Sequence, residues 1–155
     1  MKKVFRFTEK QLVDIYTIAL DSFVPTEEAI NMNKTDYLAI DMSSTFFDNI
    51  SQEGKQQILD YFKNKYNIEV MNASLDTLKE KGLTSSVGGK YVNLKSNGKR
   101  GILLGILNEK IESETEVVIE GYWFSGAVAA AGFRTTIVFK DGQWELQKTG
   151  MIWIS

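Results

Sequence analysis

The fold is decided by the C-terminal stretch FRTTIVFK-DG-QWELQKTGMIWI, residues 133–154, in which a turn dipeptide separates two runs of strand-forming residues. The dipeptide Asp141-Gly142 is a preferred two-residue hairpin turn, because both central positions of that turn need a positive φ. The register that this turn imposes places apolar residues opposite one another on one face: Phe139 with Trp144, and Ile137 with Leu146. We expect Gly150 to mark a bulge before the final apolar run.

Two further strands are predicted before this hairpin. Residues 101–107 are apolar at both odd and even positions, which is typical of a strand that is covered on both faces. In the next strand Val117, Ile119 and Trp123 share one face, because successive side chains of a strand alternate between its two sides. Together with the hairpin, these strands predict a curved antiparallel meander.

The first half of the chain has the spacing of helices. Thr8 and Gln11 stand at the spacing of a capping box, and the apolar residues after them recur at helical intervals. Ser51 can cap a second helix and Ser74 a third, which Gly82 would end in the left-handed conformation. Helices followed by a meander are an α+β plan, in which N-terminal helices pack on a curved antiparallel C-terminal sheet.

Shorter elements are expected between these helices and strands. Pro25 ends the first helix, and residues 26–30 can form a shorter helix capped by Thr26. Residues 37–40 and 68–71 can form short strands, whereas residues 84–100 are rich in Gly, Ser, Asn and Lys and are expected to form a long loop. A chain of 155 residues without a low-complexity linker predicts a single domain over residues 1–155.

The composition excludes several kinds of chemistry. The chain has no Cys and no His, so it lacks thiolate nucleophiles, disulfides, the commonest general base and the commonest transition-metal ligand. No apolar run reaches the roughly 18 residues of a membrane span, and the apolar stretch at the N-terminus is too short for a signal peptide. We expect a cytoplasmic protein, or a mature exported form without its leader, that binds neither a membrane nor a cofactor.

Charge is segregated along the chain, although the net charge is only −2. Residues 21–53 carry seven acidic residues against one basic, residues 79–100 carry six basic against one acidic, and residues 109–120 carry five acidic against one basic. These segments could steer a charged partner toward the protein, or they could be solvated surface. Nucleic acid is not an expected partner, because Tyr91 is the only aromatic residue in the basic segment and one ring is too few for a stacking platform.

Several motifs that suggest catalysis or metal binding are incomplete. Gly88-Gly89-Lys90 lacks the other residues of a phosphate-binding loop. Ser125 lacks both glycines of a nucleophile elbow, two residues before and two residues after the Ser, and the chain has no His to activate it. Three alternating glutamates could hold Ca²⁺ or Mg²⁺, although an acidic hairpin end explains them as well, and we expect no metal: Glu112, Glu114 and Glu116.

Four carboxylates are candidates for acid–base chemistry: Asp36, Asp41, Asp48 and Glu53. Asp41 is distinctive because it follows an apolar run and precedes two serines. We expect it to serve as a cap or an Asx turn, and catalysis is the alternative. Residues 121–132 combine small residues with flanking aromatics. The small residues would allow a ligand or another backbone to approach closely. Alternatively, they would pack beneath a helix where the sheet curves.

Two segments, residues 61–83 and 141–155, resemble a group of short proteins from Gram-positive bacteria, some of which carry lipoprotein leaders. The shared motifs mark packing and turns, so the resemblance implies no particular activity. Helices before a meander that ends in Gly142-Gln143-Trp144 and an apolar strand also resemble the cystatin-like and nuclear-transport-factor-2-like (NTF2-like) folds. That resemblance implies a sheet curled around a helix, with a conical pocket or a dimer face. Enzymes of those folds often use an Asp–His pair, which this chain cannot supply.

We therefore expect a non-catalytic binding domain whose partner is a protein, as in inhibitor, immunity or regulatory proteins, or a second copy of the chain. Aromatic side chains give a large contact area with few torsions to restrict. The predicted binding surface, a pocket or a sheet face, has six of them: Tyr122, Trp123, Phe124, Phe133, Trp144 and Trp153. The alternative is a small enzyme, or a carrier of a small apolar ligand, with Asp41 or Tyr122 as the acid or base.

Overall fold

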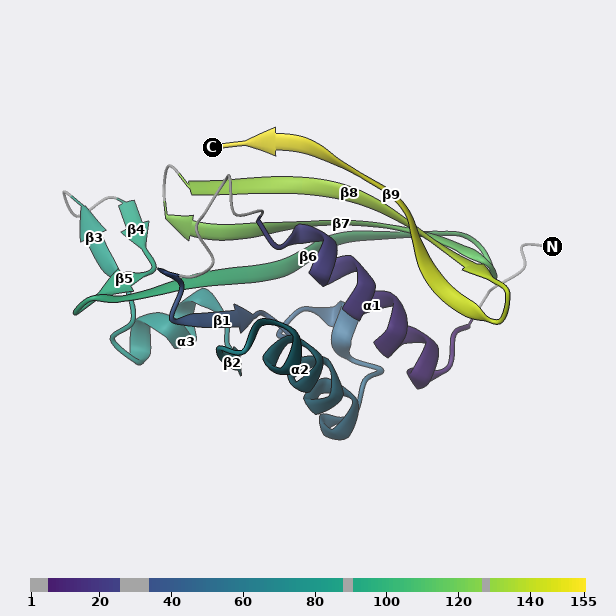
Figure 1. Cartoon of the computed structure of the whole chain (residues 1–155), viewed down its shortest axis with the longest axis horizontal. Coiled ribbons are helices and arrows are strands. Elements are labelled where there is room, and N and C mark those ends of the chain that lie inside the picture. Colours follow the sequence, from purple (N-terminus) through teal and green to yellow (C-terminus); the bar gives the residue numbers. More distant parts are fainter. Residues whose placement is uncertain (1–5, 26–33, 88–90, 127–128) are drawn as a thin grey trace.

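The structure is a computed structural model that describes residues 6–25, 34–87, 91–126 and 129–155. It is a mixed α+β fold in which helices pack on a large, mostly antiparallel sheet (Figure 1). The α+β prediction is therefore confirmed at this level. The helical elements are α1 (Glu9–Phe23), the 3-10 turn η2 (Thr45–Phe47), α2 (Gln52–Tyr66) and α3 (Leu75–Glu80).

The main sheet has the strand order β2-β1-β6-β7-β8-β9, with β5 paired to β6 outside this path. The long strands β6 to β9 follow one another as the predicted antiparallel meander, whereas β1 runs parallel to both β2 and β6. The strands of this sheet are β1 (Tyr37–Ile40), β2 (Glu69–Asn72), β5 (Lys95–Ser96), β6 (Lys99–Ser113), β7 (Glu116–Gly126), β8 (Ala129–Lys140) and β9 (Gln143–Ile154).

The loop predicted for residues 84–100 is wrong, because this segment contains three short strands. β3 (Ser85–Val87) and β4 (Tyr91–Asn93) form a separate two-stranded sheet, and β5 forms a hairpin with β6. The turn of that hairpin is Asn97-Gly98, with φ values of 51° and 78°. Asn-Gly favours a two-residue turn for the same reason as Asp-Gly, so the sequence contained a signal for this hairpin.

The C-terminal hairpin forms in the predicted register. Asp141 and Gly142 have φ values of 54° and 82°, and Phe139 lies opposite Trp144. The predicted bulge at Gly150 is wrong, because Gly150 lies directly opposite Arg134 on β8. The register shifts instead on either side of that pair, where β9 has an extra residue at each of two positions, Gln147 and Ile152. Neither position has the positive φ that favours glycine, so no residue type in the sequence indicates these two bulges.

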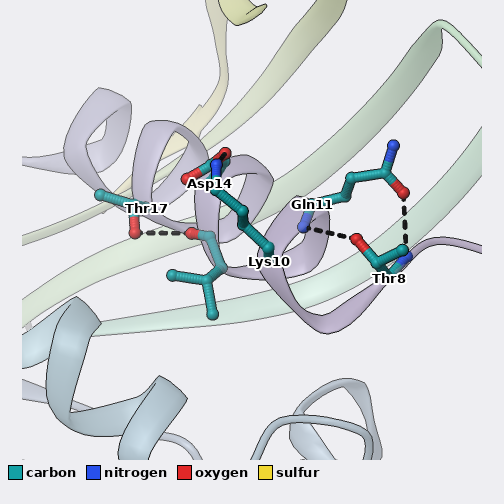
Figure 2. Close-up of polar contacts among 6 residues, drawn as sticks. Thr8, Lys10, Gln11, Asp14 and Thr17 are labelled. Atoms are coloured by element: carbon teal, nitrogen blue, oxygen red, sulfur yellow. Dashed lines mark hydrogen bonds and ion pairs between the residues drawn. The ribbon is translucent and has the colours of Figure 1, made fainter.

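The predicted helix starts are confirmed at all three caps. The backbone N–H of Gln11 donates to Thr8 Oγ1 at 3.2 Å, and the N–H of Thr8 donates to Gln11 Oε1 at 2.8 Å (Figure 2). Ser51 and Ser74 cap α2 and α3, and Gly82 follows α3 with a φ of 72°. The short helix expected at residues 26–30 lies outside the described residues.

The sheet has an apolar cluster on each face. α1 crosses the first face over β6 to β9 and packs beside α2 (Figure 1), and the cluster there includes Phe23, Leu104 and Trp123. The cluster on the second face includes Tyr37, from β1, and Leu78, from α3. Both faces of residues 101–106 are therefore covered, which explains why this run is apolar at every position.

Candidate functional site

The six aromatic residues predicted to form one binding surface are divided between the two faces of the sheet. Trp123 and Trp144 belong to the helix-side core, with 5% and 8% of their surfaces exposed, and Phe133 packs against the same core. Tyr122 and Phe124 pack against the cluster on the opposite face. Residues 122–124 are consecutive on one strand, and successive side chains point to opposite faces. No single pocket or sheet face can therefore contain all six residues.

Trp153 differs from the other five residues because 41% of its surface is exposed. It lies at the end of β9, on the outer edge of the sheet (Figure 1). Four consecutive large apolar residues are exposed there, with exposed fractions of 56%, 39%, 41% and 71%: Met151, Ile152, Trp153 and Ile154. Among the described residues, β9 pairs only with β8. We call residues 151–154 the β9 edge.

Two of the glycines between residues 121 and 132 have an aromatic ring of the chain itself in the space that a side chain would occupy. A Cβ at Gly121 would overlap the ring of Phe23 from α1, and a Cβ at Gly132 would overlap the indole of Trp153. A Cβ at Gly105 on β6 would likewise overlap the ring of Tyr122. Gly121 therefore packs beneath α1, which confirms for this residue the prediction that small residues pack beneath a helix.

Asp41 forms the predicted Asx turn. Its Oδ1 accepts the backbone N–H of Ser43 at 2.9 Å and the Ser43 hydroxyl at 2.5 Å. Burial, reinforced by the negative charge of Asp41, raises the pKa of Tyr122 to about 12. A phenol with such a pKa remains protonated at neutral pH, so Tyr122 is a poor general base there.

The remaining candidate residues have structural partners or lie on the surface. Asp36 accepts the backbone N–H of Arg100 at 2.8 Å, and the Ser125 hydroxyl donates to the carbonyl oxygen of Gly101 at 2.9 Å. Asp48 and Glu53 are exposed. Of the three alternating glutamates, Glu112 forms an ion pair with Lys110 at 3.2 Å. Within the described ranges, no group of three or more acidic side chains is placed to hold a metal ion.

Sequence reasoning missed a polar cluster that joins α1 to α2. Asp21 in the last turn of α1 accepts three hydrogen bonds from α2: from the hydroxyls of Tyr61 and Tyr66 at 2.9 and 2.5 Å, and from Lys65 Nζ at 2.5 Å. Burial and the hydrogen bond to Asp21 raise the pKa of Tyr66 above its ordinary value. This cluster crosslinks the helix pair, and its partners are too far apart in sequence to form a recognisable motif.

A second feature missed from the sequence is a cavity of about 580 Å³ at the N-terminal end of α1. It is bounded by α1, the η2 turn and β6, and the half-buried Glu109 is one of its lining residues. Tyr16 OH lies 3.2 Å from both carboxylate oxygens of Glu109. Burial raises the pKa of Glu109 above its usual range, and the hydrogen bond from Tyr16 opposes that effect in part.

Comparisons with known proteins provide no family for this chain. No protein-family model, no curated protein and no solved structure matches it. Within the part of the chain that the structure describes, no helix is both long enough and apolar enough to cross a membrane.

Proposed function

We propose that the protein is a non-catalytic protein-binding domain, of the inhibitor, immunity or regulatory kind, whose partner docks on the β9 edge. The observation that carries this proposal is the exposure of four consecutive large apolar residues on an outer strand of the sheet. An edge strand presents unpaired backbone N–H and C=O groups, so an extended segment of a partner can add to the sheet through main-chain hydrogen bonds.

The chemistry of the β9 edge also supports docking. Soluble proteins usually protect a sheet edge with charged residues, proline, or a covering helix or loop. Residues 149–155 contain no charged side chain and no proline, and Lys148 is the nearest charged residue. The exposed apolar side chains of the β9 edge are of the kind that marks a protein interface. Trp153, one of the predicted binding residues, lies at its centre, and Trp is enriched among residues that dominate binding energy.

The proposed fold relationship is to the cystatin-like and NTF2-like folds. It is supported by α1, which crosses one face of the β6–β9 meander (Figure 1). In this arrangement the helix covers one face of β8 and β9 and leaves the outer edge of β9 to a partner. Binding would therefore require no rearrangement of the helices.

The test compares capture of a partner by matched variants. Met151→Lys places a charge on the β9 edge, and Tyr91→Lys places the same charge on β4. The two side chains are matched in exposure, at 56% for Met151 and 57% for Tyr91. Each purified protein is immobilised and exposed to an extract of the native host. We expect wild type and Tyr91→Lys to retain the same protein, and Met151→Lys to retain it at least about tenfold more weakly.

Hydrogen exchange then locates the contact. The amides of β9 should become protected in the complex, while those of β4 should not. Equal retention by all three proteins, or protection confined to elements other than β9, would contradict the proposed site. A wild-type protein that is dimeric, and that Met151→Lys makes monomeric, would identify the partner as a second copy of the chain.

A further inference from the structure

The cavity at the N-terminal end of α1 combines aromatic walls with one acidic side chain. Its volume is about 580 Å³. Its aromatic lining residues are Phe7, Tyr16 and Phe46, its aliphatic ones include Leu12 and Ile111, and its carboxylate is Glu109. Arg6, Thr45 and Asn49 complete the lining, so aromatic and aliphatic side chains are combined here with polar groups that could orient a small molecule.

Glu109 faces this cavity because of a bulge in β6. Ile106 is buried on the helix side of the strand with 6% of its surface exposed, so regular alternation would turn Glu109 to the opposite face. The register with β7 shifts between Ile106 and Asn108, and Leu107 is 53% exposed at that position. After the shift Glu109 lies opposite Ile119, which is fully buried on the helix side.

A bulge that redirects a side chain is frequent beside functional sites. Here the bulge places the carboxylate of Glu109 on the helix side of β6, whereas the preceding helix-side positions of this strand hold Ile or Leu. Placing a charge there is unfavourable unless the charge acquires a partner. This placement therefore needs a reason beyond packing.

The carboxylate of Glu109 lacks a cationic partner within the described residues. Tyr16, which is only 2% exposed, provides its hydrogen bond. The ion pairs of the described chain involve other acidic residues, and Arg6, which also lines the cavity, is not within 4.0 Å of Glu109. A neutral phenol cannot compensate the charge of a carboxylate, so the Glu109 end of the cavity is complementary to a positive ligand.

We propose that this cavity binds an organic cation, a methylated ammonium compound with a small apolar body, whose charge lies between Glu109 and the aromatic rings. Aromatic faces attract cations, and recognition of quaternary ammonium groups by several rings is a known use of this attraction. A carboxylate removed from water adds a stronger attraction than it would on the surface. One carboxylate is a poor site for Ca²⁺ or Mg²⁺, which require several oxygen ligands.

The test uses choline and its uncharged isostere 3,3-dimethylbutan-1-ol, which differ only in a nitrogen cation that replaces a carbon atom. Tetramethylammonium and benzyltrimethylammonium are added as a smaller and a larger cation. Binding is followed by NMR shifts of the Phe46 ring and the Ile111 methyl groups. We expect at least one of the three cations to bind with a Kd below about 10 mM, and the uncharged isostere to bind at least about tenfold more weakly than choline.

Two variants with the same change of net charge provide the control. Glu109→Gln preserves the size of the side chain and an acceptor for Tyr16 OH, whereas Glu112→Gln removes an exposed carboxylate of the same strand. We expect Glu109→Gln to weaken cation binding at least about tenfold and Glu112→Gln to leave it unchanged. Absence of binding by all three cations, equal binding of choline and its isostere, or equal losses in the two variants would overturn the proposal.

Discussion

The indole ring of Trp153 on β9 packs directly over Gly132 on β8, in the space that a side chain at position 132 would occupy. The ring of Tyr122 lies in the same way over Gly105 on β6, and Gly132 is the cross-strand neighbour of Tyr122. On the face away from α1, aromatic rings therefore replace the missing side chains of glycines on adjacent strands. On the opposite face the ring of Phe23 fills the space at Gly121.

Replacing these glycines by Ala should destabilise the protein, and the loss should be larger where the aromatic ring over the glycine cannot move aside. Gly121→Ala should lower the free energy of unfolding by about 3 kcal/mol, because Phe23 is fully buried and the carbonyl oxygen of Gly105 also blocks the space. Gly132→Ala should cost only about 1 kcal/mol, because the half-exposed Trp153 can turn away. Urea denaturation measures both changes.

Gly150→Ala is the matched control for this series. Nothing lies within 4 Å of a Cβ built at Gly150, so the free energy of unfolding should change by no more than about 0.5 kcal/mol. If Gly121→Ala were as well tolerated as Gly150→Ala, the packing of Phe23 over the sheet would be wrong.

The parts of the fold that could be predicted from sequence are those set by residues close together in the chain. The Asp141-Gly142 turn and the capping box of Thr8 and Gln11 require a particular residue at a particular spacing, and the structure forms them as predicted. The parallel pairing of β1 with β2 and β6 could not be predicted from residues close together in the chain. That pairing joins segments that are far apart in sequence, and four-residue strands carry little information about their neighbours.

The candidate sites were less predictable because bulges change which face a residue occupies. Simple alternation assigns Glu109 to the face away from α1, and only the shift at Leu107 brings it into the cavity. Alternation also separates Tyr122 from Trp123, so grouping the aromatic residues by proximity in sequence could not define one surface. Exposure of Trp153 depends on its position on the outermost strand, which is a property of the whole sheet.

The polar cluster around Asp21 should contribute strongly to stability. Asp21→Ala leaves the Tyr66 hydroxyl and Lys65 without their hydrogen-bond acceptor, and we expect it to lower the free energy of unfolding by about 2–3 kcal/mol. Tyr61→Phe, at a 40% exposed side chain, should cost no more than about 0.5 kcal/mol. Thermal unfolding followed by circular dichroism can compare the two variants.

The exposed ion pair between Lys10 and Asp14 is a control for the Asp21 cluster. It lies on the surface of the same helix (Figure 2), so Lys10→Ala should change stability by less than about 0.5 kcal/mol. An Asp21→Ala variant as stable as Lys10→Ala would mean that the cluster does not hold the two helices together.

Removing the charge of Asp41 should alter Tyr122 without unfolding the protein. Asp41→Asn keeps an oxygen that can accept the N–H of Ser43, so the Asx turn should persist. The pKa of Tyr122, raised to about 12 by burial and by the Asp41 charge, should fall but stay above its ordinary value, because burial is the larger cause. Absorbance titration of the tyrosines, referenced to Tyr122→Phe, measures the change. A pKa of Tyr122 that does not move would indicate that Asp41 lies too far away to act on it.

The buried carboxyl of Glu109 should make stability depend on pH in a defined direction. Burial raises its pKa in the folded protein above the ordinary value of 4.5, so between the two pKa values the folded state binds more protons than the unfolded state. Stability from this group therefore falls as the pH rises through that interval and then remains lower. Glu109→Gln removes the titrating group, so its free energy of unfolding relative to wild type should increase from pH 4 toward pH 8. Urea denaturation at a series of pH values measures this difference, with Glu112→Gln as the reference for a loss of exposed charge. A difference that decreases with pH would mean that the carboxylate of Glu109 is better stabilised in the folded protein than in water.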